Sequence, residues 1–152
     1  MKLAEALALR ADASRRVEQL RNRITSNARY QEGEPPSEDA AALLAEADEV
    51  LAELESLIRR VNRTNAATAF GDGTLTDAIA RRDILRLRHS VLTVAADAAA
   101  GQGGMRQLRS ELRWLSALPV AELRSRAGEV ARELRVLDVD IQRINWEADL
   151  LD

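Results

Sequence analysis

Apolar residues recur along this chain at alternating steps of three and four positions, the spacing of one face of an α-helix. The pattern stops where Gly and Pro cluster, because Pro cannot continue a helix and Gly weakens its interior. It predicts four long helices, at about residues 2–29, 37–70, 74–100 and 119–151. The segment 101–118 is predicted to be irregular or to hold a short helix, which the spacing of its leucines favours from residue 105 onward.

The last predicted helix has the most regular pattern. Nine apolar residues from Leu123 to Leu151 follow the alternating step without a miss, as in the seam of a coiled coil. Pro119 suits the first turn of this helix, and Gly128 is its weak point, costing roughly 1 kcal/mol relative to Ala. In the third helix Leu85, Leu87 and their apolar neighbours form one broad face.

Caps and charges support a helical bundle. Ser37 is predicted to cap the second helix, and Thr74 with Asp77 has the spacing of a capping box. Residues 1–29 carry seven basic and three acidic groups (net +4), whereas residues 30–70 carry three and nine (net −6). Short connections make neighbouring helices antiparallel, and the opposite charges favour that pairing. We therefore predict an all-α fold, an elongated antiparallel helical bundle with coiled-coil-like long helices.

Length and helix size bear on domain number and assembly. A chain of 152 residues favours one domain, so residues 1–152 are predicted to form a single helical-bundle domain. Helices of about 30 residues are too long for a compact monomer of this size. Long apolar seams usually need a partner, and we expect the chain to form a homo-oligomer.

Composition excludes several kinds of chemistry. The chain has no cysteine and a single histidine, His89, which excludes disulfides, thiol catalysis and multi-histidine metal sites within one subunit. We expect no metal and no cofactor. A net charge of −3 with 3% aromatic residues gives little support for nucleic-acid binding. No stretch free of charged residues exceeds eight positions, so we expect a cytoplasmic protein without membrane binding.

Seven polar residues lie within or beside the apolar rows. They are Arg10, Asn62, Asn65, Arg82, Asp83, Gln142 and Asn145. One interpretation is a shared pocket in which Arg10 or Arg82 binds an anion and the amides orient it. The interpretation that we favour is that these groups satisfy one another and fix register and oligomeric state, as a buried Asn does in coiled coils. No residue is assigned a catalytic role.

Several short blocks, in this order along the chain, resemble a family of small bacterial proteins labelled septicolysin or septicolysin-like. The blocks are Met1–Leu7, Gln31–Glu34, Asn62–Asn65, Arg81–Asp83, Leu137–Asp138, Ile141–Gln142 and Asn145–Trp146. The resemblance implies a mostly helical homo-oligomer, such as a hexamer, without an established activity. Residues 105–108 depart from the family pattern. The label itself implies a thiol-activated pore-forming toxin, yet the chain has no cysteine and no long alternating strand.

We therefore predict a self-assembling cytoplasmic helical protein of structural or interaction type. Two alternatives stay open. One is a pore-forming cytolysin of the septicolysin type. The other is an anion-binding or small-ligand-binding protein, or an enzyme, with a polar site containing Arg82 and Asp83 at a subunit boundary.

Overall fold

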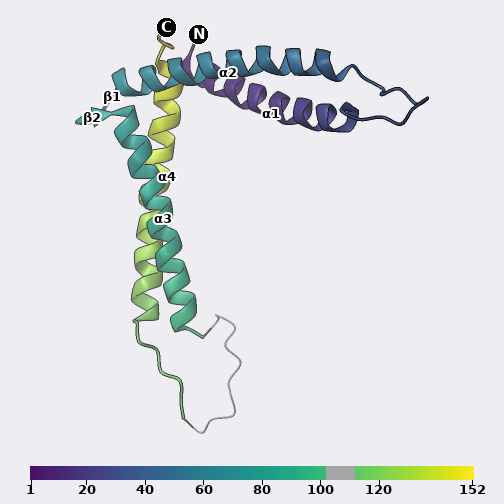
Figure 1. Ribbon diagram of the computed structural model, residues 1–152. Helices are drawn as coiled ribbons and strands as arrows, with labels where there is room; N and C mark the ends of the chain where they lie inside the picture. Colours follow the sequence, from purple (N-terminus) through teal and green to yellow (C-terminus); the bar gives the residue numbers. More distant parts are fainter. Residues whose placement is uncertain (102–111) are drawn as a thin grey trace. The chain divides into compact units, whose positions relative to one another are not determined.

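The computed structural model describes residues 1–101 and 112–152 of the chain (Figure 1). The helices are α1 (Leu3–Asn27), α2 (Ala40–Ala67), α3 (Leu75–Ala99) and α4 (Val120–Glu147). Two very short strands, β1 (Ala69–Phe70) and β2 (Gly73–Thr74), pair as a hairpin between α2 and α3. Gly71 in the hairpin turn has a φ of +56°, a conformation that glycine adopts without strain. The predicted all-α class is confirmed.

The starts of α2 and α3 depend on side-chain caps. The predicted cap of α2 was wrong by two positions: Asp39, not Ser37, accepts hydrogen bonds from the amides of Ala41 and Ala42, at 2.9 and 3.3 Å. The Thr74–Asp77 capping box is confirmed, with the Thr74 amide donating to the Asp77 carboxylate at 2.8 Å. The backbone and side-chain hydrogen bonds from Thr74 lower the pKa of Asp77.

The end of α4 differs from the prediction. The helix stops at Glu147 rather than at residue 151, and Leu150 is buried whereas Leu151 is exposed. The cause is a contact far away in sequence, because the amide of Leu3 donates to the carbonyl of Ala148 at 2.9 Å. Pairing with the start of the chain thus replaces the last helical turn.

The segment between α3 and α4 is described in part. Residues 112–119 form neither helix nor strand, so no helix covers the described end of the predicted short helix, and residues 105–111 lie outside the described residues. The amide of Leu123 donates to the carbonyl of Pro119 at 3.0 Å. Pro119 therefore lies just before α4, one position ahead of the predicted first turn.

The contacts of the chain fall into two compact units. The first unit comprises Met1–Ala69 and Arg143–Asp152, and the second comprises Phe70–Gln142. The backbone of α4 runs from the second unit into the first without a break. The prediction of a single domain stays a prediction.

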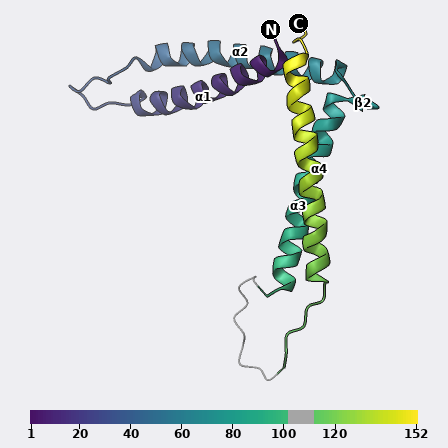
Figure 2. The same ribbon diagram turned by 180° about the vertical axis from the view of Figure 1, so that it is seen from behind.

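In the first unit, α1 and α2 lie side by side and antiparallel (Figures 1 and 2). Their facing residues form an apolar core in which Ala13, Leu20, Leu43 and Val50 are buried, with Val17, Ile24, Ala47 and Leu54 packed against them. One flank of this core is charged, because Arg16 lies 3.6 Å from Glu46 and 3.9 Å from Glu53. The opposite charges that the sequence shows for these two segments thus meet as ion pairs.

The two ends of the chain also lie together in the first unit (Figure 2). Lys2 and Asp149 form an antiparallel bridge, and their side chains make an ion pair of 2.7 Å. The hydrogen bond and charge of Lys2 lower the pKa of Asp149. The tail is bound to α2 as well, since Arg60 Nε donates to the carbonyl of Leu151 at 3.0 Å.

In the second unit, α3 packs antiparallel against the part of α4 before residue 143. The apolar residues buried here are Leu75, Ala78, Leu85, Leu92 and Ala96 on α3, and Leu123, Ala127, Val130, Leu137 and Ile141 on α4. Two ion pairs agree with this direction, Asp97–Arg124 at 3.0 Å near the end of α3 and Arg86–Asp138 at 3.6 Å near its middle. These α4 residues match the predicted seam.

Replacing Gly128 with alanine is expected to stabilise the protein by about 1 kcal/mol. Gly128 lies inside α4, its surroundings are solvent, and an added Cβ would meet nothing within 4 Å. Thermal unfolding followed by circular dichroism should show a rise in Tm of roughly 2–4 °C. The control is Gly71→Ala, which should lower Tm because its positive φ disfavours a side chain. An unchanged or lower Tm for Gly128→Ala would contradict the placement of Gly128 inside α4 with open space around it.

Candidate functional site

The predicted polar residues of the first unit differ in burial. Asn145 is buried, Asn65 is partly buried, and Arg10 and Asn62 are exposed. Arg10 occupies a position in the apolar row of α1, but the long side chain reaches solvent. The row on α2 continues through Val61 and Thr64 rather than through the asparagines, so the amides do not line one polar row.

In the second unit, Arg82 and Asp83 belong to a small network of charges. Arg82 is only 22% exposed, and its Nε lies 3.3 Å from Asp83 and 3.9 Å from Asp138 on α4. Arg86 approaches the same Asp138 at 3.6 Å and Asp83 at 3.9 Å. Two guanidinium groups thus face two carboxylates, and this balance favours mutual pairing over binding of an added anion. Gln142 is exposed.

Two buried polar residues were not among the sequence candidates. The hydroxyl of Thr64, only 1% exposed, donates to the carbonyl of Arg60 at 2.8 Å and accepts from the amide of Leu151 at 3.0 Å. Asn27 donates to the carbonyl of Arg23 at 2.9 Å and accepts from the amide of Glu38 at 3.1 Å. Thr64 lies three positions after Val61, and Asn27 lies three positions after Ile24, so each continues the apolar row of its helix. This spacing could have identified both residues from the sequence.

An ion pair that ties two elements of the first unit lies beside Asn27. Arg23 Nε donates to both carboxylate oxygens of Glu38, at 3.1 and 3.0 Å. This hydrogen bonding lowers the pKa of Glu38 and raises that of Arg23. The pair joins α1 to the segment that leads into α2. The pKa shifts of Arg23 and Glu38 therefore follow from a contact that stabilises the fold.

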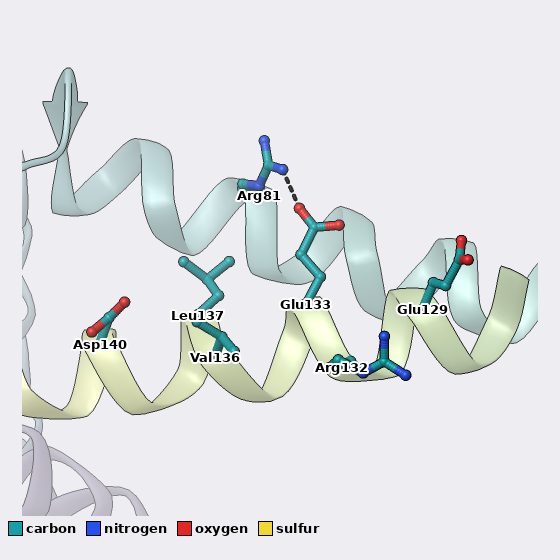
Figure 3. Close-up of a pocket in the computed structure, with 7 residues that line it drawn as sticks. All are labelled: Arg81, Glu129, Arg132, Glu133, Val136, Leu137 and Asp140. Atoms are coloured by element: carbon teal, nitrogen blue, oxygen red, sulfur yellow. Dashed lines mark hydrogen bonds and ion pairs between the residues drawn. The ribbon is translucent and has the colours of Figure 1, made fainter.

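An open hollow of about 460 Å³ lies along α4 beside Arg81 of α3 (Figure 3). Arg81 forms an ion pair with Glu133 across it. Its lining residues are Arg81, Glu129, Arg132, Glu133, Val136, Leu137 and Asp140. Because both basic and acidic residues line this hollow, it does not favour a ligand of either charge.

A second hollow of about 690 Å³ lies between the end of α3 and the segment before α4. It is lined by Ala95, Ala98–Gly101 and Trp114–Leu118. Neither this hollow nor the first is lined by any of the seven predicted polar residues. Across residues 1–101 and 112–152, no three His, Asp or Glu side chains are grouped so that they could hold a metal ion. Within the same residues, no helix has the length and apolar character needed to cross a membrane.

The most distinctive surface of the second unit is an apolar outer stripe on α3, made of Ile84, Leu87, Val91 and Val94. These side chains are 55%, 62%, 67% and 64% exposed. Leu87 and Val94 each follow a buried leucine by two positions, a rotation of about 200°. The stripe therefore faces away from the core that α3 shares with α4. The broad apolar face predicted for this helix consists in fact of two faces, one buried and one exposed.

The first unit carries a second exposed apolar row on α2. Leu44, Leu51 and Ile58 are spaced by seven positions and are 54%, 46% and 38% exposed. Because a spacing of seven returns to the same side of a helix, the three side chains lie in one line. This row is less exposed than the outer stripe of α3 and has three large apolar residues rather than four.

Fold and surface together define a small all-helical protein of paired antiparallel helices with apolar outer faces. The chain belongs to a family of unknown function (DUF6847), whose model matches residues 10–150. It is also similar to a solved protein from Corynebacterium diphtheriae, described as a functionally unknown conserved protein. The two are 38% identical, the match covers 99% of each chain, and the TM-score is 0.92. No curated protein matches the chain. These matches do not bear on the septicolysin-like resemblance, which stays a prediction.

Proposed function

We propose that this protein is an interaction protein that assembles with further copies of itself through its exposed helix faces. The observation that carries the proposal is the outer stripe of α3, in which four large apolar side chains are each more than half exposed. A helix that is apolar on opposite faces is typical of a helix buried on both sides. Within the described residues only one of those sides is covered.

The energetics favour covering the outer stripe. Full burial of a side chain such as Leu87 or Val91 is worth about 1.5–3 kcal/mol relative to full exposure. Four such residues in line, repeated on two copies, offer enough apolar area to offset part of the entropy lost on association. The contiguous stripe thus differs from scattered apolar residues, which are common on protein surfaces.

The alternative of an anion-binding site or enzyme has less support. The network of Arg82, Asp83, Arg86 and Asp138 pairs its own charges, and neither hollow is lined by the predicted polar residues. The role that we infer for this network is to fix the register of α3 against α4. The pore-forming alternative predicts leakage of dye-loaded vesicles at low protein concentration. The cytoplasmic location and a hexamer stay predictions.

Polar substitution within the outer stripe is expected to reduce the mass of the assembly. Light scattering after gel filtration should give a mass above 16.8 kDa for the unmodified chain. The mass should fall toward that of one chain for the double variant Leu87→Ser/Val91→Ser. Leu9→Ser, which removes an exposed leucine of α1, is the matched control and should keep the larger mass. Equal masses for all three proteins would show that this face is not the contact.

A further inference from the structure

The two flanks of the outer stripe carry opposite charges. Asp83, Ser90 and Asp97 each directly precede a residue of the line that runs from Ala80 through the stripe to Ala98. Arg81 and Arg88 each directly follow a residue of that line. Arg86 also precedes a residue of the line, but it pairs with Asp138 of α4, as Arg81 and Asp97 pair with Glu133 and Arg124. The flank charges that α4 does not engage are therefore Asp83 on one side and Arg88 on the other.

The direction in which two helices pair decides which flanks meet. In an antiparallel pair, residues that precede seam positions on one helix meet residues that precede seam positions on the other. The first unit of this chain shows the rule, since Arg16, Glu46 and Glu53 all directly precede seam residues and lie within 4 Å as ion pairs. In a parallel pair the two different flanks meet instead.

We propose that the outer stripe of α3 pairs in parallel with the same stripe of a second copy, with Asp83 of each copy opposite Arg88 of the other. The inference rests on the proposed function, because it specifies the orientation and charge contacts of the same self-association. Both residues are exposed, and no ion pair links Arg88 to another of the described residues. Asp83 has neighbours on its own helix, Arg82 and Arg86, but both contact its Oδ1 atom, which leaves Oδ2 to accept from Arg88 of the other copy.

An antiparallel pair of the same stripes would bring like charges together. With Ala80 of one copy opposite Ala98 of the other, Arg88 lies beside Arg88, and no ion pair within the described residues balances either charge. Asp83 falls beside Asp97, whose charge Arg124 of α4 already pairs, so the arginines carry the argument. Juxtaposed like charges oppose association. Charge complementarity therefore selects the parallel direction.

The apolar residues favour the same arrangement. If Ile84 and Val91 occupy the first seam position of each heptad, Leu87 and Val94 occupy the second, and Val94 is the one of these four residues that departs from the parallel preference. Parallel two-stranded coiled coils prefer Ile or Val at the first position and Leu at the second. The partner that fits this surface is thus a second copy of α3 in parallel register.

Cross-linking through introduced cysteines tests the direction, because the natural chain has none. Ala80 and Ala98 are exposed at opposite ends of the stripe, about 27 Å apart along the helix. In the parallel pair, Ala80→Cys alone and Ala98→Cys alone should each form covalent dimers on oxidation. Ala11→Cys, an exposed site on α1, controls for random collision and should stay uncoupled.

The outcomes separate this inference from the proposed function. Covalent dimers that form only when the two variants are mixed would show an antiparallel pair, overturning the direction while keeping self-association. No covalent dimer in an assembly that still has a larger mass would place the contact elsewhere and overturn the inference. A parent chain that is monomeric at every concentration would overturn the proposed function as well.

Charge reversal provides an independent readout of the same contact. Asp83→Arg and Arg88→Asp should each raise the dissociation constant about tenfold, and the double variant should restore it. In an antiparallel pair Asp83→Arg would instead strengthen association, since it removes the repulsion from Asp97. Far-UV circular dichroism of each variant checks folding, because Asp83 also contacts Arg82 and Arg86 within its own copy. Tighter association of Asp83→Arg, or a double variant no better than the singles, would overturn the pairing.

Discussion

Replacing Leu20 with alanine is expected to lower the free energy of unfolding by about 2–5 kcal/mol. Leu20 is 2% exposed and lies in the core of the first unit with Leu43 and Val50. Truncation removes buried methyl groups and leaves a cavity between two long helices that cannot close in around it. Urea unfolding followed by circular dichroism at 222 nm measures the loss.

The matched control for Leu20 lies on the same helix. Leu9 is 41% exposed, so Leu9→Ala should change the free energy of unfolding by less than about 1 kcal/mol. Both variants alter helix propensity in the same way, and only the burial differs. If the two substitutions cost the same, the packing described for α1 and α2 is wrong.

Replacing Thr64 with valine is expected to lower the free energy of unfolding by about 1–3 kcal/mol. Valine keeps the shape of the buried side chain but removes the oxygen that accepts from the amide of Leu151. That N–H then loses its partner, and the tail keeps only its arginine contacts to α2, such as that of Arg60 with the carbonyl of Leu151. Urea unfolding gives the energy, and faster hydrogen exchange of the Leu151 amide locates it.

Thr68→Val is the control for Thr64. The Thr68 hydroxyl donates to the carbonyl of Thr64 at 2.7 Å, and that carbonyl also accepts from the Thr68 amide at 2.9 Å. Because the bond from the amide remains, removing the Thr68 hydroxyl leaves that carbonyl with a partner. Thr68→Val should therefore lower the free energy of unfolding clearly less than Thr64→Val does. Unchanged exchange of the Leu151 amide in Thr64→Val would contradict the role given to this hydroxyl.

The helices could be predicted from the sequence because their signals are local. Apolar spacing identified all four, and the Thr74–Asp77 box marked the start of α3. The end of α4 could not be predicted in this way. It depends on a hydrogen bond between Leu3 and Ala148, residues at opposite ends of the chain, and no local pattern shows that contact.

The polar residues show a different limit of sequence reasoning. Asn62 and Thr64 are two positions apart, and only the register of α2 against its neighbours decides which is buried. Thr64 lies in the row of Leu57 and Val61, so the threonine enters the core and Asn62 reaches solvent. Arg82 contacts Asp83, its neighbour in sequence, whereas its second partner, Asp138, depends on the packing of α4.

The exposed apolar surface of α3 was the feature that the sequence predicted least well. Ile84, Leu85 and Leu87 are close in sequence and equally apolar, so periodicity merged them into one broad face. In the structure Leu85 is buried, whereas Ile84 and Leu87 are exposed. A pattern within one chain indicates apolar faces but does not state whether the same chain or a second copy covers each of them.

Sedimentation equilibrium of the unmodified chain over a wide range of concentrations tests self-assembly most directly. Self-assembly predicts a mass that rises with concentration to at least twice 16.8 kDa, or that already has such a value at the lowest concentration. A mass of one chain at every concentration would contradict it.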